Sequence, residues 1–245
     1  MAPVSPATDA PTPAHSDHVA HPPALAWSLG PLRPALPQGA LDVWRADLSA
    51  SEQPLERLLC EQELARAKRL LSASHRRLWI RSRGLLRELL GRYLAEDPSA
   101  LCFAVDAHGK PHLSGAAQAR VEFNLSHSGT LALYAFCADA PVGVDVQADR
   151  PSGDDVAIAE RILGPLAAAE LRAIGDPRER RAQFLRMWTR YEAEAKCVGT
   201  GIGADTHTSR ARVWGVGLDM GTGAAGAVAC TNEPRELRCW EWPPN

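Results

Sequence analysis

The sequence carries little net charge and has no long hydrophobic run. Its 27 lysines and arginines nearly balance 29 aspartates and glutamates, which leaves a formal charge of −2. So small a net charge creates no overall field that would attract nucleic acid or an anionic membrane. No apolar run approaches the roughly 18–20 residues that a membrane-spanning helix needs. We therefore expect a protein that binds neither nucleic acid nor membranes.

Closely spaced cysteine pairs are also absent. None of the six cysteines belongs to a Cys-x-x-Cys pair, and they are scattered across a chain too large to need disulfide bonds for its stability. The N-terminus has neither the basic start nor the continuous apolar stretch of a secretory signal peptide. These observations predict a cytoplasmic protein with reduced thiols. The cysteines are Cys60, Cys102, Cys137, Cys197, Cys230 and Cys239.

Proline is concentrated at the N-terminus. Residues 1–37 hold nine of the 19 prolines and few charged residues. A segment of this composition buries too little apolar surface to offset the entropy lost on ordering. We therefore predict a disordered leader over residues 1–38, and we interpret His15, His18 and His21 as solvated tail residues rather than a metal site.

Hydrophobic periodicity and turn residues predict a mixed α+β fold. The helix ending at residue 198 has the clearest boundaries, because Asp176 is a good N-cap, Pro177 suits the first helical position and Gly199 favours a left-handed end. Residues 126–129 are predicted to form a turn. The expected elements are strands at 41–48, 121–125, 131–137 and 142–146, helices at 54–71, 74–94, 154–174 (interrupted at 164–165) and 176–198, and glycine-rich strands between 212 and 240.

The helix expected at 74–94 has an apolar stripe on one face and arginines on the other. The stripe comprises Leu78, Leu85, Leu86, Leu89, Leu90 and Tyr93. The arginines are Arg76, Arg77, Arg81, Arg83, Arg87 and Arg92. Two interpretations stay open, because a solvated polar face and an anion-binding site both place arginines opposite a core stripe.

The two halves of the chain resemble each other weakly. The segment from His127 to Cys137 aligns with the segment from Met220 to Cys230, and each is followed by a proline. This predicts two similar α+β lobes, at 39–140 and 141–245, with a ligand in the crevice between them. Because the duplication supplies both lobes in one chain, we expect a monomer.

Two polar segments follow one another in the middle of the chain. Residues 124–129 combine serines, a histidine and a glycine, which suits phosphate binding but is also common in turns. Asp145 and Gln147 lie two apart on a predicted strand, so both side chains leave the same face. Their oxygens are ligands of the kind that Mg²⁺ prefers. Two polar groups on a solvated strand face would explain the same pattern.

A third polar pair lies on the well-capped helix. Phe184, Trp188 and Tyr191 form part of a core stripe, and Glu192 and Lys196 are four residues apart on a neighbouring face. One interpretation is a helix salt bridge that stabilises by roughly 0.2–0.5 kcal/mol. The other assigns Glu192 to a metal and Lys196 to a phosphate oxygen.

Taken together, these motifs resemble those of a known family. The sequence Asn-Leu-Ser-His-Ser-Gly at 124–129 is followed by Gly-Val-Asp-Val at 143–146 and by Trp-Thr-x-x-Glu-Ala-x-x-Lys at 188–196; His-Gly-Lys-Pro at 108–111 precedes them. This order resembles the 4′-phosphopantetheinyl transferases, specifically the two-lobed, broad-specificity, surfactin-synthetase-activating type. The resemblance covers about residues 41–230. It implies two similar α/β lobes related by a pseudo-twofold axis.

The resemblance also implies an enzymatic reaction. Such enzymes transfer the 4′-phosphopantetheine arm of coenzyme A to a serine of apo acyl or peptidyl carrier proteins of fatty acid, polyketide or non-ribosomal peptide synthases, and release 3′,5′-ADP. By resemblance, Asp145, Gln147 and Glu192 hold Mg²⁺, with Mn²⁺ as an alternative. Glu192 is the candidate base for the serine hydroxyl, and Lys196 acts on the departing phosphate.

The coenzyme A contacts are implied in the same way. Arg76 or Arg77 is expected at the 3′-phosphate, and the spacing does not decide between them. Arg66 is expected to add to the same anion site. The remaining implied contacts are Gly109, Lys110, Ser126, His127 and Lys196.

Two positions depart from the family pattern. Gln147 stands where a second acid usually follows the metal-binding aspartate, and Tyr191 stands where a lysine usually precedes the glutamate. Loss of one negative charge predicts weaker metal binding. The alternative prediction is therefore a catalytically weakened member of the fold that binds coenzyme A or a nucleotide. Ile158, Ile162 and Leu163 could contact the carrier, but their periodicity favours a place in the core.

Overall fold

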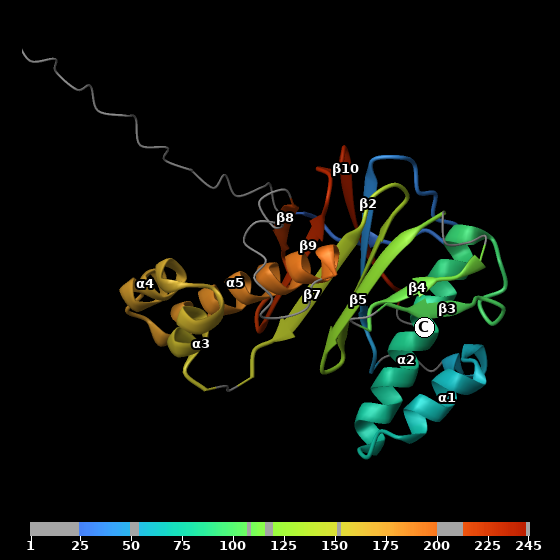
Figure 1. Cartoon of the computed structure of the whole chain (residues 1–245), viewed down its shortest axis with the longest axis horizontal. Coiled ribbons are helices and arrows are strands. Elements are labelled where there is room, and N and C mark those ends of the chain that lie inside the picture. The colour runs from blue at the N-terminus through green and yellow to red at the C-terminus, as the bar shows by residue number, and fades with distance from the viewer. Residues whose placement is uncertain are drawn as a thin grey trace, which may run out of the picture.

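The computed structural model describes residues 25–49, 54–106, 109–115, 120–150, 153–199 and 213–243. Within these residues the chain forms a five-stranded sheet, a three-stranded sheet, a two-stranded hairpin and several helices (Figure 1). The predicted mixed α+β fold is therefore confirmed. His15, His18, His21 and His108 lie outside the described residues.

The larger sheet combines strands from both ends of the chain. Its order is β1-β10-β2-β6-β5, in which β2, β6 and β5 are antiparallel and β10 runs parallel to β2. The last strand thus joins the first sheet, between β1 and β2. The strands are β1 (Ser28–Leu29), β2 (Ala40–Asp47), β5 (Glu122–Ser128), β6 (Leu131–Cys137) and β10 (Glu236–Glu241).

The predicted leader at 1–38 is too long. Ser28 and Leu29 pair with β10, and the indole nitrogen of Trp27 donates a hydrogen bond to the carbonyl oxygen of Asp219 at 2.6 Å. Leu25 and Trp27 also pack against a buried hydrophobic cluster. These two apolar side chains give residues 25–38 surface to bury, which the proline-rich composition does not reveal.

The smaller sheet lies beside a long helix. Its antiparallel strands have the order β7-β9-β8, and α5 packs across β7 and β9 (Figure 1). A Cβ atom at Gly143 would lie 2.0 Å from the carbonyl oxygen of Ala193, so only glycine permits this close approach. The elements are β7 (Val142–Ala148), β8 (Trp214–Leu218), β9 (Ala224–Cys230) and α5 (Pro177–Val198).

The ends of α5 agree with the sequence. The Asp176 side chain accepts a hydrogen bond from the backbone N–H of Arg178, Pro177 begins the helix, and Gly199 ends it with a φ of 72°. A left-handed glycine after the last turn satisfies carbonyls that the helix itself leaves unpaired. Both predicted boundaries of this helix are confirmed.

The remaining helices lie at the two ends of the molecule (Figure 1). α1 and α2 lie beside the larger sheet, and a short hairpin, β3–β4, lies near them. α3 and α4 pack on α5 at the other end. These elements are η1 (Leu55–Leu58), α1 (Glu61–Lys68), α2 (Ala73–Leu94), β3 (Phe103–Val105), β4 (Pro111–Leu113), α3 (Asp155–Ile162) and α4 (Pro165–Ala173).

Two local predictions are wrong. The helix expected at 54–71 is interrupted, because Cys60 adopts extended backbone and caps α1, with Glu63 completing the capping box. The turn expected at 126–129 is also displaced. β5 continues through Ser128 and pairs with β6, so that the chain reverses only at Gly129 and Thr130.

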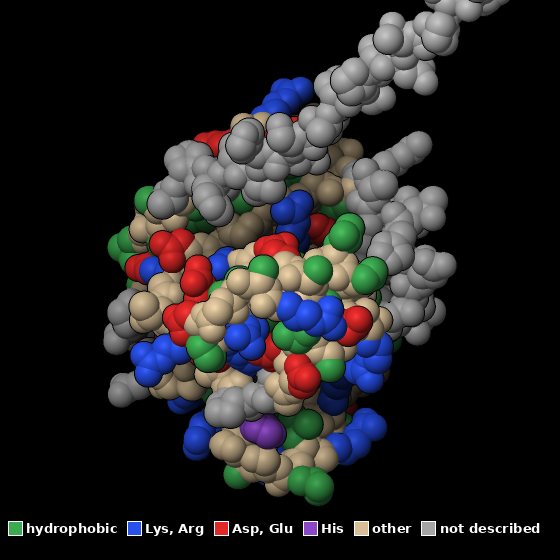
Figure 2. Space-filling model, turned by 90° about the vertical axis from the view of Figure 1, so that its left-hand side faces the viewer, with side chains coloured by type: hydrophobic (Ala, Val, Ile, Leu, Met, Phe, Trp, Pro, Cys, Tyr) green, Lys and Arg blue, Asp and Glu red, His purple; other side chains and the backbone are tan. Residues whose placement is uncertain are grey.

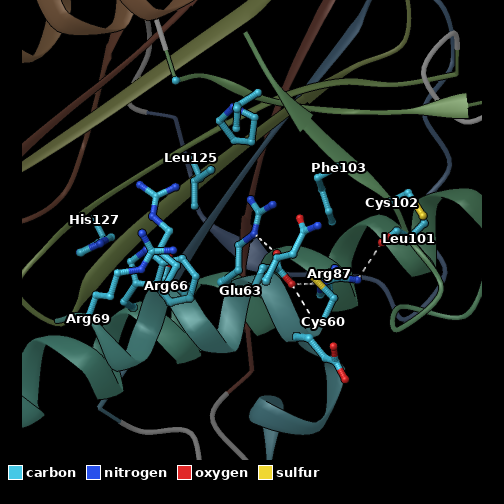
Figure 3. A pocket seen from close by; sticks show the side chains of 18 residues that line it. Cys60, Glu63, Arg66, Arg69, Arg87, Leu101, Cys102, Phe103, Leu125 and His127 are labelled. Atoms are coloured by element: carbon cyan, nitrogen blue, oxygen red, sulfur yellow. Dashed lines mark hydrogen bonds and ion pairs between the residues drawn. The ribbon is translucent and has the colours of Figure 1, made fainter. Parts of the chain in front are cut away.

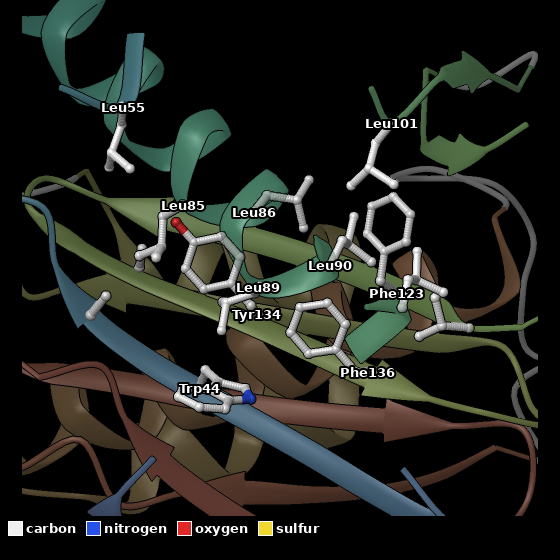
Figure 4. Close-up of a cluster of buried hydrophobic side chains, with 14 of the residues drawn as sticks. Trp44, Leu55, Leu85, Leu86, Leu89, Leu90, Leu101, Phe123, Tyr134 and Phe136 are labelled. Atoms are coloured by element: carbon white, nitrogen blue, oxygen red, sulfur yellow. The ribbon is translucent and has the colours of Figure 1, made fainter. Parts of the chain in front are cut away.

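The core of the larger sheet lies under α2. The α2 leucines at 85, 86, 89 and 90 are buried and face aromatic side chains of the sheet (Figure 4). The aromatic partners are Trp44, Phe123, Tyr134 and Phe136. Burying a leucine contributes about 1.5–3 kcal/mol, so this stripe is a main source of stability for the region.

The molecular face at the α3–α4 end is mixed in character. Basic and acidic side chains are interspersed there, and hydrophobic side chains are scattered (Figure 2). Ion pairs cross this end, including Arg172–Glu160 and Arg181–Asp155, each at 2.5 Å. Among the described helices, none combines the length and apolar character needed to cross a membrane.

A buried polar cluster fixes β10 in the larger sheet. The Arg238 guanidinium of β10 donates to Asp42 of β2 at 2.6 Å, and the Tyr93 hydroxyl of α2 donates to the same carboxylate at 2.5 Å. The Trp44 indole in turn donates to the Tyr93 hydroxyl at 2.7 Å. Burial raises the pKa of Asp42, and the bonds from Arg238 and Tyr93 oppose that rise.

We predict that Arg238→Met lowers the free energy of unfolding by about 3 kcal/mol near neutral pH, because a buried carboxylate loses its charged partner. A raised folded-state pKa stabilises the fold below the unfolded pKa, and this stabilisation is lost as the pH rises through the folded value. The destabilisation caused by Arg238→Met should therefore be smaller at acidic pH, where Asp42 is protonated. Urea denaturation at acidic and at neutral pH measures it.

Arg235→Met is the matched control, because Arg235 is exposed and lies just before β10. It should change stability little at either pH. An Arg238→Met loss of the same size at both pH values would contradict the assignment to the Asp42 carboxylate.

Candidate active site

Three predicted site residues from different elements meet directly. The hydroxyl of Ser126 on β5 donates to the Asp145 carboxylate on β7 at 2.7 Å. The ammonium of Lys196 on α5 donates to the same oxygen, Oδ1, at 2.5 Å and to the Ser126 hydroxyl at 3.1 Å. The two sheets and α5 therefore share one polar centre.

The packing of α5 explains this convergence. Gly143 lets the helix approach β7 closely, and Glu192 and Lys196 are one helical turn apart on α5. Glu192 and Asp145 are both buried, at 7% and 6% exposure. Buried carboxylates are costly without compensation, and Lys196 supplies it for Asp145.

The donor set of this centre consists of oxygens. Asp145 and Gln147 lie two apart on β7, so they leave the same face of the strand, and Glu192 is a buried carboxylate one helical turn before Lys196 on α5. Carboxylate and amide oxygens suit hard divalent cations such as Mg²⁺. No group of three or more histidines, cysteines or acids with metal-binding geometry occurs among the described residues.

A pocket of about 780 Å³ lies on the other side of β5 (Figure 3). Leu125 and His127 of β5 line it, whereas Ser126 contacts Asp145. Successive side chains of a strand point to opposite faces, so β5 carries one residue of the polar centre between two residues of the pocket.

Positive charge dominates the charged lining of the pocket. Four arginines line it against two glutamates, with His127 in addition. Aromatic rings form part of the wall, and Arg83 lies 4.1 Å from the centre of the Phe103 ring. Aromatic surface combined with arginines suits a ligand with a flat ring and an anionic group. The charged lining residues are Arg66, Arg69, Arg83, Arg87, Glu61 and Glu63.

Two of these arginines are already paired. Arg83 and Arg87 both donate to the Glu63 carboxylate, and Arg87 also donates to the carbonyls of Pro98 and Leu101 at 2.8 and 3.0 Å. Burial lowers the pKa of Arg83, and its bond to Glu63 opposes this. The solvated-face interpretation is therefore wrong for Arg83 and for Arg87, whose side chain is 1% exposed.

The pocket arginines from the first helix are placed differently. Arg66 and Arg69 lie one helical turn apart at the end of α1 and point toward the cavity in Figure 3. Arg66 also approaches the Trp79 ring, at 5.8 Å from its centre. Arg66 was expected at an anion site, whereas Arg69 and Trp79 were not. The spacing of Arg69 three residues after Arg66 is the signal that could have found it.

His127 lines the pocket and is near enough to Lys196 to be affected by its charge. Part of its surface is open to solvent, yet the surrounding protein removes enough water to lower the pKa of the ring. The positive charges of Lys196 and His75 lower the pKa further. The imidazole is therefore largely neutral at neutral pH. An anion bound beside it would favour its protonated form.

The other expected ligand contacts divide between two places. Gly109 lines the pocket, but the Lys110 ammonium donates to the carbonyls of Val142 and Lys196 at 3.0 and 2.9 Å. Arg76 donates to the Leu70 carbonyl at 2.8 Å, and neither it nor Arg77 lines the pocket. Gly109 and His127 are thus brought together with Arg66, while Lys110 and Arg76 bond to backbone carbonyls.

Both halves of the chain are similar to known proteins. Residues 44–138 match the family model described as "4'-phosphopantetheinyl transferase, N-terminal", and residues 141–240 match that of the "4'-phosphopantetheinyl transferase superfamily". The protein named "4'-phosphopantetheinyl transferase HetI" of Nostoc sp. is 36% identical over 180 residues, which cover 72% of this chain and 76% of the relative.

Shorter matches include "4'-phosphopantetheinyl transferase psf-1" of Bacillus pumilus. It is 36% identical over 136 residues, covering 52% of this chain and 55% of the relative. A Synechocystis sp. protein named "Putative 4'-phosphopantetheinyl transferase slr0495" is 30% identical over 159 residues, which cover 63% of this chain and 64% of the relative. With two consecutive family models and a relative matched over most of its length, the chain belongs to the 4′-phosphopantetheinyl transferase superfamily and is a phosphopantetheinyl transferase.

Proposed function

We propose that the protein transfers the 4′-phosphopantetheine arm of coenzyme A to a serine of apo acyl or peptidyl carrier proteins and releases 3′,5′-ADP, with a divalent cation. The observation that carries this proposal is the polar centre of Ser126, Asp145 and Lys196 beside an arginine-lined pocket. The centre and the pocket share β5, so one ligand could reach both.

The pocket suits the adenosine end of coenzyme A. Trp79 and Phe103 offer aromatic surface to the base, and Gly109 leaves room beside the ring. Arg66 and Arg69 offer charge to the 3′-phosphate, because arginine donates paired hydrogen bonds to phosphate oxygens. The pantetheine arm would then leave the pocket past β5.

The pyrophosphate belongs at the polar centre. Asp145, Glu192 and the Gln147 amide would hold a divalent cation, which would neutralise the pyrophosphate and act as a Lewis acid on it. Lys196 places a positive charge beside the same oxygens. Removing either carboxylate would thus disturb alignment as well as charge, and phosphoryl transfer depends mainly on both.

Glu192 is the proposed base for the carrier serine. A general base must reach the hydroxyl directly or through one water. The position of Glu192 on α5, one helical turn before Lys196, supports this assignment. The proton leaves the serine as its oxygen attacks the β-phosphorus, and the bond from that phosphorus to the 3′,5′-ADP oxygen breaks. Lys196 would stabilise the charge that develops on this leaving oxygen.

Mass spectrometry of apo carrier proteins tests the activity. Incubation with the purified protein, coenzyme A and Mg²⁺ should add one phosphopantetheinyl arm to at least one of several acyl and peptidyl carriers. Saturable binding of coenzyme A without modification of any carrier would instead support a weakened, ligand-binding member of the family.

We predict that Asp145→Ala and Glu192→Ala each lower kcat by about 10³-fold, equivalent to about 4 kcal/mol, because each removes a carboxylate that holds the cation. Metal-free binding of 3′,5′-ADP should be nearly unchanged, because the pocket residues remain in place. The two measurements are carrier modification and calorimetry.

The matched control is Asp149→Ala, since Asp149 lies just beyond β7 and pairs with Arg181 at 3.0 Å. It should retain turnover close to the wild type. If Asp145→Ala kept turnover near that of this control, the proposed role of the polar centre would be refuted.

We also predict that 3′,5′-ADP binds more tightly as the pH falls. The pKa of free His127 is lowered, and a neighbouring phosphate would raise it, so binding takes up a proton over the pH range between the two values. His127→Gln should remove this share of the pH dependence. Calorimetry in buffers of different ionisation enthalpy measures proton uptake directly.

The ligand phosphate itself titrates near pH 6, so the wild type must be compared with His127→Gln under identical conditions. The difference between the two proteins isolates the imidazole. Equal proton uptake in both would show that His127 stays neutral beside the bound ligand.

A further inference from the structure

The two sheets meet along β5 and β7 without a backbone ladder. Each strand is the edge of its own sheet, and the two strands pack side by side. Backbone groups that are buried at such a junction need other partners. The side chains of β5 provide them.

Alternate residues of β5 bond to β7. The Asn124 side-chain oxygen accepts from the backbone N–H of Val144 at 3.0 Å, and the Ser128 hydroxyl accepts from the backbone N–H of Ala148 at 3.0 Å. Between them, Ser126 donates to Asp145. Because strand side chains alternate, all three residues leave the same face of β5.

These bonds flank the proposed cation ligands. Val144 directly precedes Asp145, and Ala148 directly follows Gln147. Asn124 thus fixes the peptide on one side of the ligand pair, and Ser128 fixes the peptide on the other. Because Asn124 is only 4% exposed, water cannot readily replace its bond to Val144.

We propose that Asn124 and Ser128 are positioning residues of the transferase, which hold β7 so that Asp145 and Gln147 present their oxygens to the proposed cation. This inference rests on the proposed function for the role of Asp145. It gives the first and last polar residues of the Asn-Leu-Ser-His-Ser segment a task that does not involve touching coenzyme A.

The test combines amide hydrogen exchange with kinetics on the full chain. In Asn124→Ala the Val144 amide, and in Ser128→Ala the Ala148 amide, should exchange about tenfold faster, because each loses its acceptor. Both variants should lower kcat about 10–100-fold, the usual effect of removing a group that orients a metal ligand. The dissociation constant of 3′,5′-ADP should stay within about twofold, because the pocket arginines and aromatics are untouched.

Two further variants separate positioning from a general loss of structure. Ser128→Thr keeps the hydroxyl and should restore both slow exchange and turnover. Ser99→Ala is the matched control, because Ser99 bonds to Asp97 on the surface and should leave every readout unchanged. If Asn124→Ala failed to fold, the comparison of Ser128→Ala with Ser128→Thr would decide alone.

The proposal is overturned if the two amides exchange as in the wild type, if kcat is unchanged in both alanine variants, or if kcat and 3′,5′-ADP binding fall in parallel. These failures differ from failure of the proposed function, which would appear as a wild type that modifies no carrier. Exchange needs no turnover, so it would still support or overturn the bridging role of both residues in that case.

Discussion

The close approach of α5 to β7 is the constraint on which the site depends. A Cβ atom at Gly143 would lie 2.0 Å from the Ala193 carbonyl oxygen and 2.4 Å from the Cys197 nitrogen, so any side chain would push the helix away. At this separation Lys196 reaches Asp145 from the helix. The glycine of the Gly-Val-Asp-Val segment is thus a packing requirement, and it places the charged residues of two elements within reach of each other.

Charge balance explains why the arginines of the first half serve different purposes. Glu63 is held by Arg83 and Arg87, and the second of these is almost wholly buried. A buried arginine needs a carboxylate and carbonyl partners, so this pair supports the fold of α1 against α2. Arg66 and Arg69 have no part in that cluster and are left at the pocket. Composition shows the excess of arginine, but only the position of Glu63 shows which arginines it occupies.

Local patterns predicted the local features well, and they could not predict long-range pairing. The caps at Asp176 and Gly199 depend on neighbours in sequence, and both were correct. The pocket combines side chains from α1, α2, β3 and β5, and no periodicity relates them. Lys110 illustrates the limit, because its motif implied a ligand contact while its ammonium bonds to the carbonyls of Val142 and Lys196.

The boundary between the two family models divides the sequence more cleanly than the structure. The two matched ranges meet between residues 138 and 141, where the chain passes from β6 to β7. Strand β10, from the second range, nevertheless lies in the sheet of the first half. Arg238 of β10 compensates the buried Asp42 of β2, so the first sheet depends on the end of the chain. Because β5 belongs to that sheet and bonds to β7, anything that displaces β10 should also disturb the junction at which Asp145 is held. The site between the sheets and the packing of the last strand are therefore parts of one structural unit.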